Sequence, residues 1–204
     1  MNLNINQIIL GGFLIRFGFA FYGGFLGNMI GADSDALSFH FRAANIWYNI
    51  GMEHYNSMFR SDSFILDGTN LYIYILELIY KITIPHLFIG CLFSCFVWFY
   101  SAKTLSKVCY LLKVTTLNHK KILFIYSIWP SSIIFCSLTL REPLQLLCVN
   151  LFILLFLKIY YLKINIIKNF LLILLISYLL SSLHYSFLFS CLLMISLLIF
   201  LFFY

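Results

Sequence analysis

Charged side chains are scarce in this sequence. Asp, Glu, Lys and Arg together make up 10% of its 204 residues, whereas 63% of the residues are hydrophobic. A water-soluble domain carries about 25% charged residues, because its surface must be polar. So little charge excludes a soluble globular domain and predicts that lipid is the main solvent of the chain. We therefore expect an all-α fold, a polytopic transmembrane helical bundle.

The sequence also lacks a cysteine framework. Its six cysteines lie in or beside apolar runs, and none falls in the polar segment 31–70. No C-x-x-C spacing of the kind found in zinc and redox sites occurs. The cysteines are therefore expected to be small apolar packing residues rather than disulfide partners or metal ligands.

The basic residues do not form a pattern typical of nucleic-acid binding, although the net charge is +6. Two groups of lysines lie between apolar runs: Lys103, Lys107, Lys113, Lys120 and Lys121 in the first, and Lys158, Lys163 and Lys168 in the second. Short basic loops beside hydrophobic spans mark the cytoplasmic side of a membrane protein. The sequence thus predicts no nucleic-acid partner, a multi-pass protein of a bacterial inner membrane, and cytoplasmic N- and C-termini.

Apolar runs of suitable length predict about six spans. They cover residues 8–30, 84–102, 122–140, 143–162, 166–182 and 185–204. No Lys or Arg precedes the first run and no cleavage pattern follows it, so we expect it to be retained as a span rather than removed as a signal peptide.

The first run carries two features that bear on packing in lipid. Gly23, Gly27 and Gly31 have a four-residue spacing, which favours the close approach of another helix. Arg16 lies within the same run, where an unpaired charge is costly. We expect Arg16 to pair inside the bundle or to extend toward the membrane surface.

Two segments after the first span are expected to lie on the outer side without crossing. Residues 31–70 form the predicted outer loop, in which 35–52 has the pattern of an amphipathic helix along the membrane surface. Residues 71–83 are apolar but carry Glu77 and Lys81. The apolar stretch of fourteen residues, 71–84, reaches about 21 Å as a helix, short of a bilayer core of about 30 Å. We therefore predict an interfacial or re-entrant helix at 71–83.

This topology separates the charges by sign. All seven acidic residues are placed outside, and eight of the nine lysines are placed inside, Lys81 being the exception. Asp33 and Asp35 follow the first span, with His40 and Arg42 after them on the predicted surface helix. Two carboxylates at this place suit either a general base or a divalent-cation site beside a phosphate.

A second polar pair opens the span that starts at residue 143. Arg141 offers a guanidinium fork that suits phosphate, and Glu142 is its neighbour in the chain. For both pairs, a purely structural role stays open as the alternative. Asp33 and Asp35 could only cap the surface helix, and Arg141 with Glu142 could form a solvated turn.

The arrangement of a first span, then Asp33-Ser34-Asp35, then surface helices resembles the GT-C class of membrane glycosyltransferases. The stretch from Trp129-Pro130-Ser131-Ser132 to Arg141-Glu142 is similar to a pattern in bacterial GT-C-like and O-antigen-polymerase-like proteins. The resemblance covers roughly residues 1–160. It implies a glycosyltransferase or polysaccharide polymerase that uses an undecaprenyl-phosphate-linked sugar on the outer face.

The resemblance also implies roles for individual residues. Asp33 or Asp35 would deprotonate the acceptor, and Arg141 with Glu142 would shape the donor-phosphate site. His40 and Arg42 are further candidates for substrate binding, with contact to lipid headgroups as the alternative. A divalent cation is a possible cofactor of unknown ligands. The alternative functions are a non-catalytic subunit or transporter for lipid-linked glycan, or an inactive N-terminal fragment of such an enzyme.

Overall fold

The computed structural model describes residues 4–26, 33–47, 70–163 and 165–203. Within these ranges every regular element is a helix and no strand occurs. The all-α prediction is therefore confirmed for the described part of the chain.

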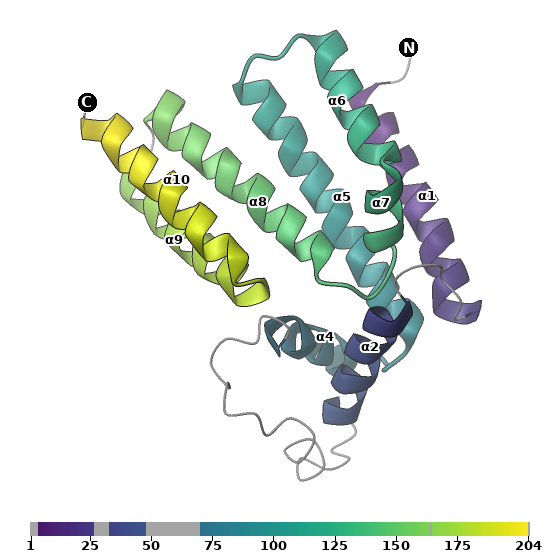
Figure 1. Cartoon of the computed structure of the whole chain (residues 1–204). Helices are drawn as coiled ribbons and strands as arrows, with labels where there is room; N and C mark the ends of the chain where they lie inside the picture. The colour runs from purple at the N-terminus through teal and green to yellow at the C-terminus, as the bar shows by residue number, and fades with distance from the viewer. Residues whose placement is uncertain (1–3, 27–32, 48–69, 164, 204) are drawn as a thin grey trace.

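The helices form a bundle with two short helices at one end (Figure 1). The longer helices are α1 (Ile5–Leu26), α5 (Leu87–Leu111), α8 (Glu142–Leu157), α9 (Ile166–Leu183) and α10 (Ser186–Phe203). The shorter helices are α2 (Asp33–Trp47), α4 (Asn70–Ile82), α6 (Thr116–Ile128) and α7 (Pro130–Phe135). A single π-helical turn, η1 (Lys158–Leu162), continues α8. α5 occupies the centre, packing against α1 on one side and α8 on the other.

Four helical segments among the described residues are long and apolar enough to cross a membrane. They are α1, α5, α8 together with η1, and α9. These segments overlap the predicted spans 8–30, 84–102, 143–162 and 166–182. α10 overlaps the predicted span 185–204 and packs against α9, but it is not one of the four. A helical membrane bundle is thus supported, while a count of six spans stays a prediction.

The predicted span 122–140 is not one continuous helix. α6 ends at Ile128, Trp129 is extended with φ −60° and ψ 118°, and Pro130 begins the short helix α7. Proline lacks a backbone N–H and disfavours helical geometry in the residue before it, so the helix breaks at this point. After the break, α7 continues toward the end of the bundle at which α2 and α4 lie (Figure 1).

The two predicted surface segments are helices that pack on each other. α2 overlaps the predicted helix 35–52, of which residues 48–52 lie outside the described residues, and α4 overlaps the predicted helix 71–83. Their shared core consists of Ala36, Phe39 and Ala43 from α2 and Tyr72, Ile73, Leu76 and Tyr80 from α4. The opposite face of α4 exposes Tyr74, Leu78 and Ile82, which is the apolar surface expected of a helix at a membrane interface.

The described acidic residues and most of the described lysines lie toward opposite ends of the bundle, whose helices are arranged as in Figure 1. The end formed by α2, α4 and the first turn of α8 carries Asp35, Glu77 and Glu142, and we call it the acidic end. The other end, which we call the basic end, carries Lys113, Lys120, Lys121, Lys158, Lys163 and Lys168. The acidic end also carries Arg42, Lys81 and Arg141, and the prediction that all seven acidic residues lie on the outer side of the membrane stays a prediction.

Close helix approach occurs at Gly12 and Gly24 of α1. A Cβ atom at Gly24 would lie 2.6 Å from the Cα of Phe88, and one at Gly12 would lie 2.6 Å from Cη2 of Trp98. Of the predicted glycine face, Gly23 is buried in α1, whereas Gly27 and Gly31 lie outside the described residues. Small residues let α1 approach α5 closely, which is how packing stabilises helices in lipid.

Candidate functional site

A cavity of about 660 Å³ opens between α6, α7, α8 and α10, and we call it the α7–α8 groove. Most of its wall is apolar. The lining residues that carry a hydroxyl, indole N–H, carboxylate or amide group are Tyr126, Trp129, Ser131, Ser132, Glu142 and Gln145. An apolar cavity with a few polar groups is the usual form of a small-molecule site, because the wall supplies affinity and the polar groups supply orientation.

Glu142 is a groove residue with a carboxylate oxygen that lacks a hydrogen-bond partner among the described residues. It is the first residue of α8, where a carboxylate interacts favourably with the positive end of the helix. Its Oε2 atom is buried, and no described atom forms a hydrogen bond with it. A buried oxygen without a partner costs free energy. A ligand hydroxyl or amide in the groove could supply the missing donor if the Glu142 side chain turned toward it.

Gln145 lies one helical turn after Glu142 and lines the same groove. Residues three apart on a helix share a face, so the spacing is the sequence signal that could have identified it. The sequence analysis did not single out Gln145. Ser131 and Ser132 stand on the opposite wall, at the start of α7.

Arg16, which is fully buried in α1, forms hydrogen bonds with the part of the groove wall around Ser132. The Nη1 atom of Arg16 donates to the carbonyl oxygen of Ser127 at 2.8 Å, and its Nη2 atom donates to Ser132 Oγ at 2.9 Å. Nη2 also lies 3.5 Å from the carbonyl oxygen of Tyr126. In an unbroken helix that oxygen would accept from residue 130, but proline has no N–H to donate. Arg16 thus donates to carbonyl oxygens in the last turn of α6, where the break in the helix removes a backbone donor.

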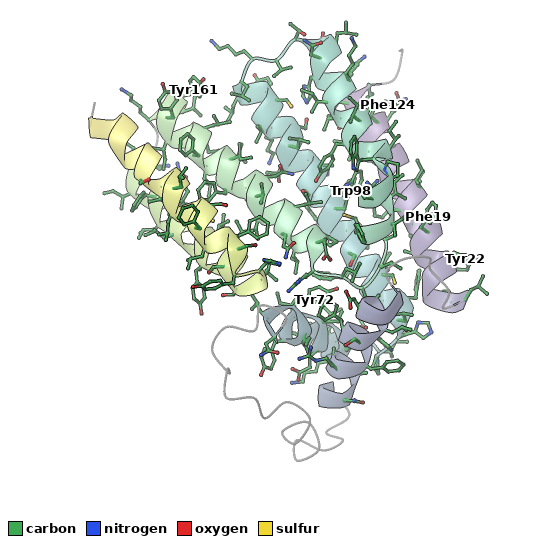
Figure 2. All side chains as sticks on the ribbon, in the orientation of Figure 1. Phe19, Tyr22, Tyr72, Trp98, Phe124 and Tyr161 are labelled. Carbon is green, nitrogen blue, oxygen red and sulfur yellow. The ribbon has the colours of Figure 1, made fainter. Side chains whose placement is uncertain are left out.

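An aromatic ring completes the environment of the Arg16 guanidinium. Trp98 of α5 lies beneath it, with 3.6 Å between the guanidinium carbon and the ring centroid. Trp98, labelled in Figure 2, also stacks on Tyr126 of α6, with 5.8 Å between the ring centroids. In the described part of the chain the one salt bridge joins Lys81 to Glu77, at 2.6 Å. The Arg16 charge is therefore met by carbonyl oxygens, a hydroxyl and a π face. Pairing inside the bundle, one of the two expectations for Arg16, is confirmed.

Arg141 does not line the groove. Its Nη1 atom donates to the carbonyl oxygen of Leu183 at 3.1 Å, at the end of α9. Gln145 Nε2 lies 3.5 Å from the same oxygen. A cation at the carboxyl end of a helix stabilises the unpaired carbonyls there. Although Arg141 and Glu142 are adjacent in sequence, the fold uses one to cap α9 and the other to line the groove.

Asp35 lies exposed on the first turns of α2, and it is not among the groove-lining residues. Asp33 begins α2, and its side chain lies outside the described part of the structure. Among the described residues, no group of three or more His, Cys, Asp and Glu side chains is close enough to hold a metal ion. The predicted divalent-cation site stays an expectation.

His40 and Arg42 connect α2 to α4 rather than to the groove. His40 Nδ1 and the Tyr80 hydroxyl are 2.7 Å apart, and Arg42 Nη2 donates to Asn70 Oδ1 at 3.4 Å. Burial, and then the neighbouring His86, lower the pKa of His40. Burial raises the pKa of Tyr80 well above its usual value. The pair therefore favours a neutral imidazole that is hydrogen-bonded to a neutral phenol.

Tyr72 is a buried residue of the acidic end that the sequence analysis did not identify. It lies on α4 and is fully buried (Figure 2). Burial is the main cause that raises the pKa of Tyr72 well above its usual value. The phenol of Tyr72 is therefore neutral at ordinary pH and belongs to the core that α4 shares with α2.

Comparisons of this chain with protein-family models, with curated proteins and with solved structures found no match.

Proposed function

We propose that this protein binds a polyprenyl-phosphate-linked glycan and transfers its sugar, as a membrane glycosyltransferase or polysaccharide polymerase of the GT-C type. The observation that carries the proposal is the α7–α8 groove, an apolar cavity lined in part by Glu142, whose Oε2 atom is buried without a hydrogen-bond partner among the described residues. The groove is bordered by α8, which with η1 forms one of the candidate spans. A prenyl chain is a long apolar ligand and matches such a wall.

The polar lining of the groove suits the phosphate and sugar of such a ligand. The Ser131 and Ser132 hydroxyls and the Gln145 amide can donate hydrogen bonds to phosphate oxygens. The Glu142 carboxylate can accept hydrogen bonds from sugar hydroxyls. We place the acidic end on the outer face, because the lysines of the other end follow the positive-inside bias.

In the proposed reaction, the carboxylate of Asp33 or Asp35 accepts the proton of an acceptor hydroxyl. The acceptor oxygen then bonds to the anomeric carbon of the donor sugar, while the bond from that carbon to the phosphate oxygen breaks. The carrier phosphate leaves with the bonding electron pair. Arg141 would stabilise this leaving group only after giving up its hydrogen bond to Leu183.

One observation favours a second candidate, a non-catalytic protein that holds or moves lipid-linked glycan. Arg141 is already hydrogen-bonded to the end of α9, and Asp35 is not among the groove-lining residues. In this candidate function the groove binds the ligand, and the carboxylates of α2 take part in no reaction.

Two measurements on the same purified variants separate these functions. Binding of a polyprenyl-phosphate-linked sugar and release of the carrier phosphate are measured for Glu142→Gln, Asp33→Asn and Asp35→Asn. A glycosyltransferase predicts that Glu142→Gln weakens binding, while at least one aspartate variant binds normally and loses transfer. A holding protein predicts that only Glu142→Gln has an effect. Normal binding by the Glu142→Gln variant contradicts both.

A further inference from the structure

A second cavity lies at the basic end of the bundle. It has a volume of about 1040 Å³ and lies against the first half of α9. Its polar lining residues are Lys163, Asn165 and Lys168, and its apolar lining residues include Ile167, Leu171 and Leu175. None of these six residues contributes to the groove, so the cavity is a separate candidate site.

The turn between η1 and α9 brings two lysines to this cavity. Lys163 and Asn165 have positive φ angles of 50° and 48°, so the chain reverses direction sharply between the two helices. Lys163 and Lys168 are exposed. Neither forms a salt bridge with an acidic side chain in the described part of the chain. The cavity therefore carries two positive charges that no described carboxylate neutralises.

The amino end of α9 adds to this positive potential. The first turn of α9 contains no acidic residue, and no side chain of Asn165 caps it. Asn169 N–H donates to the carbonyl oxygen of Asn165 at 2.9 Å. The N–H groups that precede it in the first turn have no partner within the helix, and together they form the positive end of the helix dipole. Two lysines and these N–H groups suit a phosphate.

Below the lysines, α9 presents an apolar stripe to its surroundings. Ile167, Leu171 and Leu175 are spaced four residues apart and are 79%, 60% and 53% exposed. Residues with this spacing share one helix face. α9 is a candidate membrane span, so the stripe faces the hydrocarbon region directly beneath the charged part of the cavity.

We propose that this cavity binds an anionic phospholipid of the leaflet at the basic end. Lys163, Lys168 and the first turn of α9 hold the phosphate headgroup, and an acyl chain lies along Ile167, Leu171 and Leu175. Basic pockets beside membrane spans bind anionic headgroups in this way. A free phosphate has the same headgroup chemistry, but it would leave the apolar stripe unused, so the ligand is a lipid.

The test uses the full chain in detergent micelles that contain equal amounts of phosphatidylglycerol and phosphatidylcholine. Retained lipid is measured by native mass spectrometry. The wild-type chain retains phosphatidylglycerol preferentially, and the double variant Lys163→Ala with Lys168→Ala lowers that preference about tenfold, from the loss of two charges near the headgroup. The matched control is Lys120→Ala with Lys121→Ala, which removes the same charge from the basic end but leaves the cavity intact.

Three outcomes overturn the proposal. One is equal retention by the wild type and the Lys163/Lys168 variant, and another is an equal loss in both double variants. The third is displacement of the lipid by inorganic phosphate alone. A second measurement needs no variant: a photoreactive phosphatidylglycerol should label the peptide that contains residues 163–175. Labelling elsewhere, without labelling of this peptide, also contradicts the site.

Discussion

Arg16 of α1 donates a hydrogen bond of 2.8 Å to the carbonyl oxygen of Ser127, in the last turn of α6. The two residues are 111 positions apart in the chain, and the contact joins the first helix to the wall of the α7–α8 groove. The same guanidinium binds Ser132, which lines the groove. A single buried cation thus connects the packing of the bundle to the α7–α8 groove.

We expect Arg16→Ala to destabilise the fold by about 3 kcal/mol, because it leaves buried carbonyl oxygens at the end of α6 without a donor. The free energy of unfolding in detergent micelles checks this. Lys107→Ala is the control, since Lys107 is exposed on α5 and its loss should cost less than about 0.5 kcal/mol. Equal effects of the two variants would contradict the assigned role of Arg16.

Pro130→Ala should reshape the groove without unfolding the protein. The new backbone N–H can donate to the carbonyl oxygen of Tyr126, so α6 can continue through residue 130 as a regular helix. Ser131 and Ser132 then turn to another side of the helix. Maleimide labelling of a Ser131→Cys variant, with and without Pro130→Ala, measures this change. The six native cysteines are buried, so the added thiol is the main target, and identical labelling rates would contradict the prediction.

Two glycines of α1 make a matched pair. A Cβ atom at Gly24 would lie 2.6 Å from the Cα of Phe88, whereas one at Gly18 would meet nothing within 4 Å. Gly24→Ala should cost about 1–3 kcal/mol, because backbone atoms cannot give way as a flexible side chain does. Gly18→Ala should be neutral or stabilising by up to about 1 kcal/mol, since alanine favours the helix. Thermal unfolding of the two variants under one set of conditions gives the comparison.

The contact between His40 and Tyr80 should weaken in acid. Burial lowers the pKa of His40 from its ordinary value of 6.5, so the unfolded state binds more protons than the folded state between the two pKa values. The stability from this contact is complete above pH 6.5 and decreases as the pH falls below it. Hydrogen exchange of α2, corrected for its intrinsic rate, should be faster at about pH 5.5 than at about pH 7.5. A His40→Gln variant should lose this pH dependence; its persistence would assign the effect to another group.

The sequence predicts the broad architecture well because hydrophobicity and charge act at every position. Long apolar runs identify α1, α5, α8 and α9, and the lysine-rich connections predict which ends of these helices lie together. The break at Pro130 was harder to foresee. Proline is tolerated inside membrane helices when other groups satisfy the freed carbonyls, and the satisfying group, Arg16, comes from the far end of the chain.

The site was less predictable than the fold, because neighbours in sequence need not share a function. Arg141 and Glu142 were expected to act together, yet Arg141 binds the carbonyl oxygen of Leu183 and Glu142 lines the groove. The partner of Arg141 depends on where α9 ends in space. Likewise, His40 resembles a headgroup or substrate contact in the sequence, but its partner is Tyr80 on the adjacent helix.

The most direct test of the account is where a photoreactive polyprenyl-phosphate attaches to the protein. The account predicts labelling of the peptides that line the groove, between residues 122 and 149, competition by the unlabelled lipid, and weaker labelling in the Glu142→Gln variant. Labelling confined to other parts of the chain, or labelling of the groove that neither competition nor Glu142→Gln reduces, would contradict it.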